Sequence, residues 1–405
     1  VPGLAERVGT LASTFYGEPG SRLDDVLAVT GTDGKTTVAQ FLAAMLDEPG
    51  APAVALGTLG TGTQAPSPTG LTTPDAPRLQ ANLAHLVEAG VRRVALEASS
   101  HALDQRRLDG TRVDVAVFTQ LGRDHLDYHG SQAAYAQAKS RLFERGELQG
   151  AAINADDAFE RCLRERLASG VRCVTYGRRS GELRIEDVAY DIDGIVLTLR
   201  AGDARGVARL PVLGPFNADN AAAAAAALRA RGFSFADTMA RLERIRPVAG
   251  RMEPFRRPRM PAIVVDYAHT GGALAAALAA VRAHTHGRVW CIFGAGGDRD
   301  PGKRAPMGAA AAAGADQVIV TDDNPRSEEP GAITRDILAG AGDAEARVEH
   351  DRGRALQWAL EQAGPDDLIL LAGKGHETVQ IRAGTELAWS DREAAERALG
   401  GGGDR

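Results

Sequence analysis

Short runs of apolar residues alternate with segments of helical periodicity along most of the chain. In the first half, residues 25–30, 91–96 and 113–119 have the length and composition of buried strands. A helix is predicted at residues 36–46, directly after the first strand and a glycine-containing turn. Strands that alternate with helices are typical of α/β domains built on a parallel sheet, so we predict an α/β fold.

One stretch, residues 171–213, departs from this pattern. Apolar and polar residues alternate at 183–188 and 195–199, and the turn dipeptide Asp193-Gly194 separates the two runs. Alternation with a period of two and an Asp-Gly turn are typical of antiparallel hairpins. We expect a small antiparallel patch here, followed by an alanine-rich helix at 218–231.

A proline- and arginine-rich stretch at 246–261 separates this region from a second series of alternating elements. The series predicts strands at 262–266, 289–293, 317–321 and 368–372, and helices at 273–284, 306–313, 332–340 and 353–363. That order is typical of a doubly wound, Rossmann-like domain. We therefore predict two domains, residues 1–246 and residues 247–405.

The composition narrows the functional classes. The chain has 405 residues, and its net charge of -6 leaves no basic stripe for a nucleic-acid partner. Cys162, Cys173 and Cys291 lack Cys-x-x-Cys spacing, so neither a disulfide framework nor a zinc site is predicted. No apolar run approaches the ~20 residues of a membrane span and no signal peptide is recognisable, so we expect a cytoplasmic protein without a membrane partner.

A glycine-rich loop lies between the first predicted strand and its helix, with the residues Gly31, Thr32, Asp33, Gly34, Lys35, Thr36 and Thr37. Backbone N–H groups at a helix N-terminus bind phosphate, a lysine adds positive charge, and a threonine hydroxyl suits Mg²⁺. Val29 stands six residues before Lys35, where the common P-loop has its first glycine. The loop therefore predicts a P-loop-type first domain that binds nucleotide phosphates through a variant loop.

Polar side chains follow the next two predicted strands. They are Glu97, Ser99, Ser100 and His101 after the first, and Arg123, Asp124 and His125 after the second. The carboxyl ends of parallel strands share one edge of a sheet, so both clusters should face the crevice of the glycine-rich loop. A carboxylate and an imidazole there could ligate a divalent ion, although each cluster alone is also typical of a polar surface.

Three further features are ambiguous by themselves. Lys139 lies on a predicted helix at 131–143, where a lysine is by default solvated. Arg299 and the segment Asp323-Asn324-Pro325-Arg326 each follow a predicted strand, and paired arginines suit a carboxylate ligand. Without context, the segment is more simply explained as an ordinary Asx and proline turn.

Taken in order along nearly the whole chain, many short motifs resemble those of the Mur ligases. They lie at residues 31–37, 71–74, 97–101, 104–107, 123–130, 138–139, 217, 220, 250–253, 266–269, 296–304, 323–326 and 373–377. The Ser-Ser-His and Asp-Asn-Pro-Arg segments are similar to those of the branch that adds meso-diaminopimelate rather than lysine. In that branch the arginine grips a distal carboxylate that lysine lacks.

The resemblance implies a role for each matching position. ATP would contact Gly31, Thr32, Asp33, Gly34, Lys35, Thr36, Thr37, Asn220, Arg251 and Asp266. Mg²⁺ would be held by Thr36, Glu97, His125 and Lys139, the lysine as a carbamate (N6-carboxylysine), and catalysis would depend on Lys35, Glu97, His125 and Lys139. A UDP-sugar dipeptide would contact Thr72, Thr73, Ser99, Gln105 and Arg107. The incoming amino acid would contact Arg299, Asp323, Asn324, Pro325, Arg326, Gly373 and Glu377.

The implied activity is ATP-dependent, ADP-forming ligation of meso-diaminopimelate to UDP-N-acetylmuramoyl-L-alanyl-D-glutamate in peptidoglycan precursor synthesis. The acceptor carboxylate would attack the γ-phosphate of ATP, and the amine would then displace phosphate from the acyl phosphate. Charge cancellation by Mg²⁺ and Lys35 would allow the first attack. We expect the enzyme to act as a monomer.

The chain departs from the family pattern in three places. Almost none of the amino-terminal uridine-diphosphate-binding domain is present, and we expect it to precede Val1 in the natural protein. Asp33 replaces a usual asparagine and Gly271 a usual proline. Two alternatives stay open: a truncated Mur-like paralogue that joins an amino acid to a different carboxylate, and a non-catalytic nucleotide-binding subunit. Joint retention of the catalytic lysines and metal ligands disfavours the second.

Overall fold

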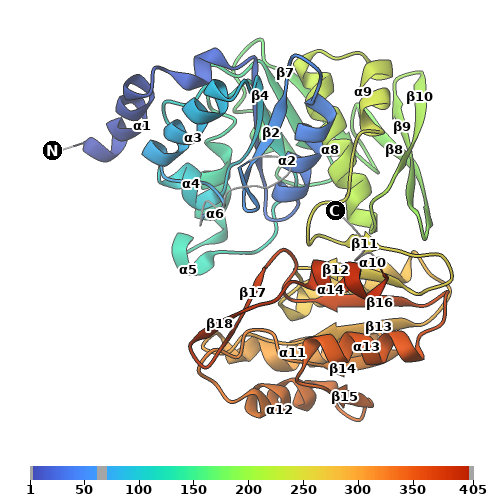
Figure 1. Ribbon diagram of the computed structural model, residues 1–405. Helices are drawn as coiled ribbons and strands as arrows, with labels where there is room; N and C mark the ends of the chain where they lie inside the picture. Colours follow the sequence, from blue (N-terminus) through green and yellow to red (C-terminus); the bar gives the residue numbers. More distant parts are fainter. Residues whose placement is uncertain (1–2, 62–70, 401–405) are drawn as a thin grey trace. The chain divides into compact units, whose positions relative to one another are not determined.

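A computed structural model describes residues 3–61 and 71–400 and divides the chain into two compact units. The first comprises residues 1–188, 196–210 and 217–246, and the second comprises residues 189–195, 211–216 and 247–405. In both units helices cover the faces of a central sheet (Figure 1). Within the described ranges, no helix combines the length and apolarity that crossing a bilayer requires.

The first unit is built on a ten-stranded sheet in the order β10-β9-β8-β7-β6-β5-β1-β4-β2-β3. Its strands are β1 Asp25–Thr30, β2 Ala53–Gly57, β3 Gly60–Thr61, β4 Arg93–Glu97, β5 Val115–Phe118, β6 Gly150–Asn154, β7 Arg172–Gly177, β8 Leu183–Asp191, β9 Gly194–Ala201 and β10 Ala204–Leu210. In sheet order, β8, β7, β6, β5, β1, β4 and β2 pair in parallel with their neighbours, and antiparallel hairpins extend both edges. The carboxyl ends of β1, β4 and β5 therefore meet at one edge of the sheet.

The helices of the first unit pack on this sheet. They are α1 Leu4–Phe15, α2 Lys35–Leu46, α3 Ala76–Glu88, α4 Ser100–Asp104, α5 Leu126–His129, α6 Gln132–Ser140, α7 Glu160–Arg164, α8 Pro215–Arg231 and α9 Phe235–Leu242, with a 3₁₀ turn at Pro19–Arg22. The alanines of α8, residues 221–227, are all buried. Their small side chains let the helix lie close to its neighbours, which is how a segment with little amphipathicity forms part of the core.

The second unit has a six-stranded sheet in the order β11-β12-β16-β13-β14-β15. Its strands are β11 Glu253–Phe255, β12 Ala262–Asp266, β13 Val289–Phe293, β14 Gln317–Val320, β15 Ala346–Val348 and β16 Leu368–Ala372, and β17 Val379–Arg382 pairs with β18 Thr385–Ala388 in a separate hairpin. Its helices are α10 Gly271–Arg282, α11 Arg304–Gly314, α12 Pro330–Ala341, α13 Arg352–Gln362 and α14 Asp391–Ala398, with a 3₁₀ turn at Pro301–Lys303. Only β11 runs antiparallel to its neighbour in this sheet.

Successive residues of the second sheet enter two different cores. Val264 and Cys291 face one core, whereas Ile263, Val265 and Trp290 face the other. Because strand side chains alternate between the two faces, a continuous apolar run means that both faces are covered. The predicted α/β class is therefore confirmed, with a mostly parallel first sheet that carries antiparallel hairpins and a mixed second sheet.

Candidate functional site

The glycine-rich loop joins β1 to α2 at the centre of the first sheet. Gly31 has φ of 149° and Gly34 has φ of 83°, backbone conformations that side chains with a Cβ rarely adopt. A Cβ at Gly31 would overlap the hydroxyl of Thr119, and one at Gly34 would press on the side-chain oxygen of Asn220. Both glycines are thus needed for the loop to pack against β5 and α8, and Asn220 lies beside the loop.

Lys35 closes the loop from the first turn of α2. Its Nζ donates hydrogen bonds to the carbonyl oxygens of Gly31, at 3.0 Å, and Thr32, at 2.8 Å. The Thr32 hydroxyl lies 3.0 Å from the Tyr135 hydroxyl, and the Asp33 carboxylate accepts a hydrogen bond from a neighbouring glutamine amide. No side chain caps the start of α2. A helix N-terminus that no side chain caps, with a lysine beside it, is an anion-binding arrangement.

Glu97, at the end of β4, is a buried carboxylate beside the loop. Its Oε2 accepts hydrogen bonds from the hydroxyls of Thr36, at 2.9 Å, and Thr58, at 3.1 Å. Its Oε1 accepts one from the Thr58 backbone N–H at 2.7 Å. Burial raises the pKa of Glu97, against the effect of these donors and of Lys35. The site therefore carries a desolvated acid that positive charge would stabilise as the anion.

Lys139 points into the same region from α6. Its side chain is 1% exposed, its Nζ donates to the Gly31 carbonyl at 2.7 Å, and it lies 4.4 Å from the centre of the Tyr135 ring. The default interpretation of a solvated lysine is therefore wrong, because α6 turns this residue inward. Burial, with the nearby positive charge of Lys35, lowers the pKa of Lys139 to about 6. At neutral pH this amine is mostly unprotonated and nucleophilic.

His125 stands apart from this group. It is exposed, has φ of 51°, and its Nε2 lies 3.4 Å from Asp124 Oδ2. Its ring packs edge-on against His101 at 4.7 Å between centroids and faces Tyr135 at 6.3 Å. Burial, and then its histidine neighbours, lower the pKa of His101. The side chain of His125 therefore belongs to a cluster of rings with His101 and Tyr135, and its ion pair and ring contacts within residues 71–400 do not involve Glu97.

The residues predicted to hold a UDP-sugar dipeptide form one hydrogen-bonded network. Thr73 donates to the Glu97 carbonyl at 2.7 Å and lies 3.3 Å from the Ser99 hydroxyl. The Arg107 guanidinium donates to the Thr73 carbonyl at 2.7 Å and to the Gln105 side-chain oxygen at 2.6 Å. Thr72 joins through the hydroxyl of Thr58, 3.2 Å away. The network continues directly from Glu97, so it borders the loop.

In the second unit, Asp266 ends β12. Its Oδ2 accepts a hydrogen bond from the Met252 N–H and its Oδ1 one from the Ala268 N–H, each at 2.8 Å. Burial raises the pKa of Asp266 in spite of these bonds. The Arg251 guanidinium stacks over the Tyr267 ring, 4.8 Å from its centre. The two residues predicted for this part of the nucleotide site are therefore neighbours in one loop region.

The loops after β14 and β16 meet at a second polar cluster. The Asn324 Nδ2 donates to Glu377 Oε2 at 2.9 Å, and Lys374 Nζ donates to the same oxygen at 2.9 Å and to Asn324 Oδ1 at 3.1 Å. Gly373 has φ of 115°, and a Cβ there would lie 2.6 Å from Asp323 Oδ2. The glycine therefore lets the Asp323 carboxylate approach the end of β16.

Arg326 lies beside this cluster. It has φ of 54°, its Nη1 donates to the Gly297 carbonyl at 2.8 Å, and its backbone N–H donates to Ile381 at 2.9 Å. The Pro325 carbonyl also lies against Gly297. Arg299 is exposed in the segment that follows. The structure thus brings the loop of Arg299 against the loop of Arg326.

The predicted residues therefore form one group around the glycine-rich loop and a second group in the other unit. In the described part of the chain, no three His, Cys, Asp or Glu side chains form a cluster that could hold a metal ion. At the loop, the Thr36 hydroxyl and the Glu97 carboxylate are oxygen donors that lie 2.9 Å apart. Cys162, Cys173 and Cys291 are free thiols.

Two family models match the chain, one in each half. The model of the Mur ligase middle domain matches residues 29–228, and that of the Mur ligase glutamate ligase domain matches residues 250–375. The chain belongs to the Mur ligase family. The two matched regions contain, respectively, the glycine-rich loop with Lys139 and the Asp323–Arg326 segment.

Curated Mur ligases match over nearly the whole chain. The UDP-N-acetylmuramoyl-L-alanyl-D-glutamate–2,6-diaminopimelate ligase of Alkalilimnicola ehrlichii is 50% identical over 404 residues, which cover 99% of this chain and 81% of the relative. The ligase of the same name from Xanthomonas campestris pv. campestris is 46% identical over 405 residues, covering 98% of this chain and 82% of that protein.

Solved structures give the same result. A structure of a UDP-N-acetylmuramoyl-L-alanyl-D-glutamate–2,6-diaminopimelate ligase superposes with a TM-score of 0.76 at 34% identity, covering 98% of this chain and 83% of the other. A Mycobacterium tuberculosis folylpolyglutamate synthase superposes with a TM-score of 0.71 at 18% identity, over 98% of this chain and 95% of that chain. The second likeness shows only that the fold is shared.

Sequence reasoning about this Mur ligase missed three site residues. Thr58 follows the short strand β2 and supplies two of the hydrogen bonds to Glu97. Tyr135 contacts both Thr32 and Lys139. Lys374 holds Asn324 and Glu377, and it lies after a predicted strand, in a motif already noted for its neighbours. Both Thr58 and Lys374 lie just after the carboxyl end of a strand, the position where ligand-binding residues of a parallel sheet are expected. That signal points to Lys374 as well as to Glu377, whereas β2 itself has no clear strand pattern in the sequence.

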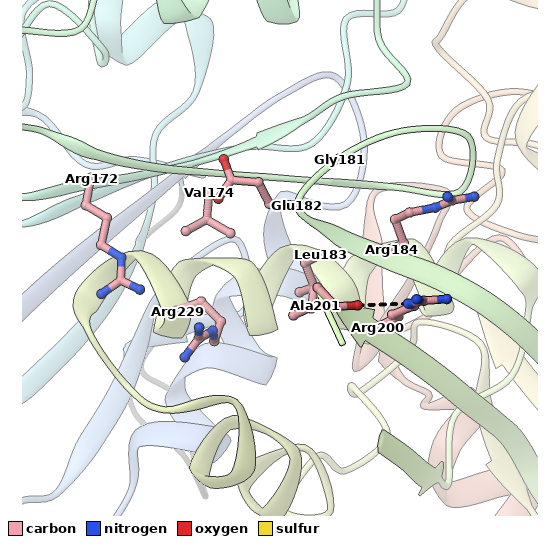
Figure 2. Close-up of a pocket in the computed structure, with 10 residues that line it drawn as sticks. Arg172, Val174, Gly181, Glu182, Leu183, Arg184, Arg200, Ala201 and Arg229 are labelled. Carbon is pink, nitrogen blue, oxygen red and sulfur yellow. Dashed lines mark hydrogen bonds between the residues drawn. The ribbon is translucent and has the colours of Figure 1, made fainter. Parts of the chain in front are cut away.

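Figure 2 shows the side chains around a further hollow, which lies within the first unit of the Mur ligase. The volume of this hollow is about 670 Å³. It is lined by Arg172, Val174, Gly181, Glu182, Leu183, Arg184, Arg200, Ala201, Gly202 and Arg229. The Arg200 Nε donates to the Gly202 carbonyl at 2.8 Å, and the Arg229 Nη1 donates to the Phe233 carbonyl at 2.6 Å. None of the predicted site residues lines this hollow, so it is separate from the glycine-rich loop.

Proposed function

We propose that this chain is an ATP-dependent, ADP-forming ligase that adds meso-diaminopimelate to UDP-N-acetylmuramoyl-L-alanyl-D-glutamate in peptidoglycan synthesis. The observation that carries the proposal is the agreement with ligases of that name over 404 residues at 50% identity. A loop followed by a helix N-terminus that no side chain caps, together with Lys35 and the buried Glu97, supports it, because these groups suit a triphosphate.

The first step in this proposal is activation of the acceptor acid. An oxygen of the glutamate carboxylate attacks the γ-phosphorus of ATP, the bond to the β-phosphate oxygen breaks, and an acyl phosphate and ADP result. Lys35 now bonds to the carbonyls of Gly31 and Thr32, so it would exchange these weak partners for phosphate oxygens. The network from Thr73 to Arg107 would hold the acceptor at the border of the loop.

Magnesium fits the oxygen donors at the loop. The Thr36 hydroxyl and the Glu97 carboxylate are already 2.9 Å apart, and oxygen ligands are those that Mg²⁺ prefers. Bound there, the ion would neutralise phosphate charge. His125 is included on the strength of the resemblance, and its described contacts are with Asp124, His101 and Tyr135.

Lys139 would act as a carbamate. A lysine amine must be unprotonated to attack CO₂, and the lowered pKa of about 6 meets that condition at neutral pH. The reaction joins the amine nitrogen to the carbon of CO₂ and releases one proton. It converts a buried base into a carboxylate-like group beside Gly31 and close to the phosphate-binding loop.

The second step would use residues of the second unit. The amine of diaminopimelate attacks the acyl carbon, loses a proton, and phosphate leaves. Glu377 and Asn324 would receive the ammonium and polar groups of the amino acid, and Arg326 with Arg299 would receive a carboxylate. In this assignment residues 1–246 bind ATP and the acceptor, and residues 247–405 bind the amino acid.

The test is an ADP-release assay with a panel of amino acids and acceptor carboxylates. The proposal predicts ADP release that requires both the UDP-sugar dipeptide and meso-diaminopimelate, with lysine a poor substitute. ADP release with a different acceptor would favour a paralogue with another substrate, and none with any pair would favour a non-catalytic subunit. ATP consumption fits the expected cytoplasmic location, and sedimentation would test the expected monomer.

A further inference from the structure

The mechanism above does not use Lys374, although its environment is unusual for a lysine. The residue follows Gly373 in the loop after β16, and its side chain is 0% exposed. Its Nζ donates to two side chains from different loops, Asn324 Oδ1 at 3.1 Å and Glu377 Oε2 at 2.9 Å. A fully buried ammonium persists only where such partners compensate it, so the cluster is built around this group.

The hydrogen bonds fix the orientation of Asn324. Its Oδ1 accepts from Lys374 Nζ and also from the Ile381 N–H, at 2.9 Å. Because both groups are donors, they identify the end of the amide that they contact as the oxygen. The Nδ2 therefore points toward Glu377 Oε2, 2.9 Å away. Without the ammonium, one of the two donors that define this amide is lost.

The same bonds define the free side of Glu377. Lys374 and Asn324 both donate to Oε2, and in the described residues no hydrogen bond reaches Oε1. The Glu377 side chain is 31% exposed, so Oε1 is the oxygen available to a ligand. Burial raises the pKa of Glu377, but the hydrogen bond and charge of Lys374, with the bond from Asn324, outweigh it and lower the pKa. Glu377 is therefore kept as an anion.

We propose that Lys374 is a positioning residue that holds the Glu377 carboxylate in place for the ammonium group of the incoming amino acid and fixes the Asn324 amide that supports this carboxylate. The inference rests on the proposed function, since it requires an amino acid to bind in the second unit. The complete burial of Lys374 argues against direct contact with a substrate. Its two partners, Asn324 and Glu377, lie on the loops after β14 and β16, so Lys374 links the two loops.

The experiment measures steady-state kinetics for Lys374→Met, which keeps the length of the side chain and removes its charge. The KM for meso-diaminopimelate should rise about 30-fold or more, as expected when one partner of a buried charge pair is removed, while the KM for ATP changes less than about twofold. The acid limb of kcat/KM for the amino acid should move to higher pH, because Glu377 would lose the group that lowers its pKa.

A matched control is Arg256→Met. Arg256 is a partly buried cation of the second unit, 26% exposed and paired with Asp193 outside the cluster. This variant should lower the melting temperature without moving the amino-acid KM or the pH limb. Equal changes in the KM of the amino acid and of ATP for Lys374→Met, or an unmoved acid limb, would show that Lys374 is merely structural.

Two further variants keep the result interpretable. Lys374→Gln retains hydrogen-bond donors but has no charge, so it should also move the acid limb to higher pH. It takes the place of the methionine variant in the assay if that variant does not fold. In a double-mutant cycle with Glu377→Gln, the effects on the amino-acid KM should be far from additive. A wild-type enzyme without amino-acid-dependent ADP release would instead refute the proposed function, so the two failures are distinct.

Discussion

Two buried lysines, one in each unit, have opposite surroundings. Lys139 is 1% exposed and meets a carbonyl oxygen and an aromatic ring. Lys374 is 0% exposed and forms an ion pair with Glu377. Burial alone therefore does not decide what a lysine does. The partners of the side chain decide it, because Lys139 is poised to lose its proton and react, whereas Lys374 is paired with a carboxylate and orients its neighbours.

The largest expected effect comes from removing the side-chain amine of Lys139. Lys139→Ala should lower kcat by about 10³-fold, because the site would lose the carbamate that would help to hold Mg²⁺ at the phosphates. A small carboxylate such as acetate or formate, or bicarbonate, should restore part of the rate, since it can take the place of the carbamate. The measurement is ADP release with and without the added acid. An unchanged rate in the variant would remove Lys139 from the mechanism.

A smaller effect is expected from Arg326, which lies beside the cluster of Asn324, Lys374 and Glu377. Arg326→Ala should raise the KM for meso-diaminopimelate by about 10- to 100-fold, as expected for a lost charge-assisted pair, and leave the KM for ATP nearly unchanged. Arg282→Ala is a suitable control, because that arginine pairs with Asp316 at the surface of the same unit. If the amino-acid KM stays at the wild-type value, Arg326 does not contact the substrate.

The two lysines should also differ in their effect on stability. In CO₂-depleted buffer, Lys139→Met should raise the melting temperature by about 2–4 °C, because folding no longer requires an amine to be buried against its preferred charged state. Lys374→Met should lower it, because Glu377 and Asn324 lose their donor. Differential scanning calorimetry would measure both. Destabilisation of similar size in the two variants would contradict the comparison.

The smallest expected effect is a pH dependence of the difference in stability between the wild type and Lys139→Met. The pKa of Lys139 is about 6 in the folded protein against 10.5 ordinarily, so between these values the unfolded chain binds more protons. The stability of the wild type should therefore rise relative to Lys139→Met as the pH is raised from 7 to 9. Melting temperatures of both proteins across that range would show the gap closing, and a constant gap would argue against a perturbed amine.

The continuous apolar runs explain which elements could be predicted. The strands Asp25–Thr30, Ala262–Asp266 and Leu368–Ala372 begin and end where expected, because both faces are covered and no alternation blurs their ends. The strand Ala53–Gly57 was missed, since small residues next to proline resemble a loop. The helix predicted at 131–143 ends at Ser140, after which the chain continues as a turn.

Local pattern alone predicted site residues only at the ends of strands, and the other site residues were predicted from the resemblance of their motifs. Glu97 and the Asp323–Arg326 segment follow strands, so the strand-end rule placed them at a sheet edge. The burial of Lys139 depends on which face α6 turns inward, and the role of Lys374 depends on Asn324, fifty residues away along the chain. Such long-range contacts cannot be read from local pattern or composition.

The central claim is that the acceptor acid becomes an acyl phosphate at the glycine-rich loop. The most direct measurement uses acceptor labelled with ¹⁸O in the glutamate side-chain carboxylate and analyses the inorganic phosphate by mass spectrometry. The account predicts one ¹⁸O atom in each phosphate released, because the attacking carboxylate oxygen leaves with the phosphoryl group. Unlabelled phosphate formed together with the ligated product would contradict it.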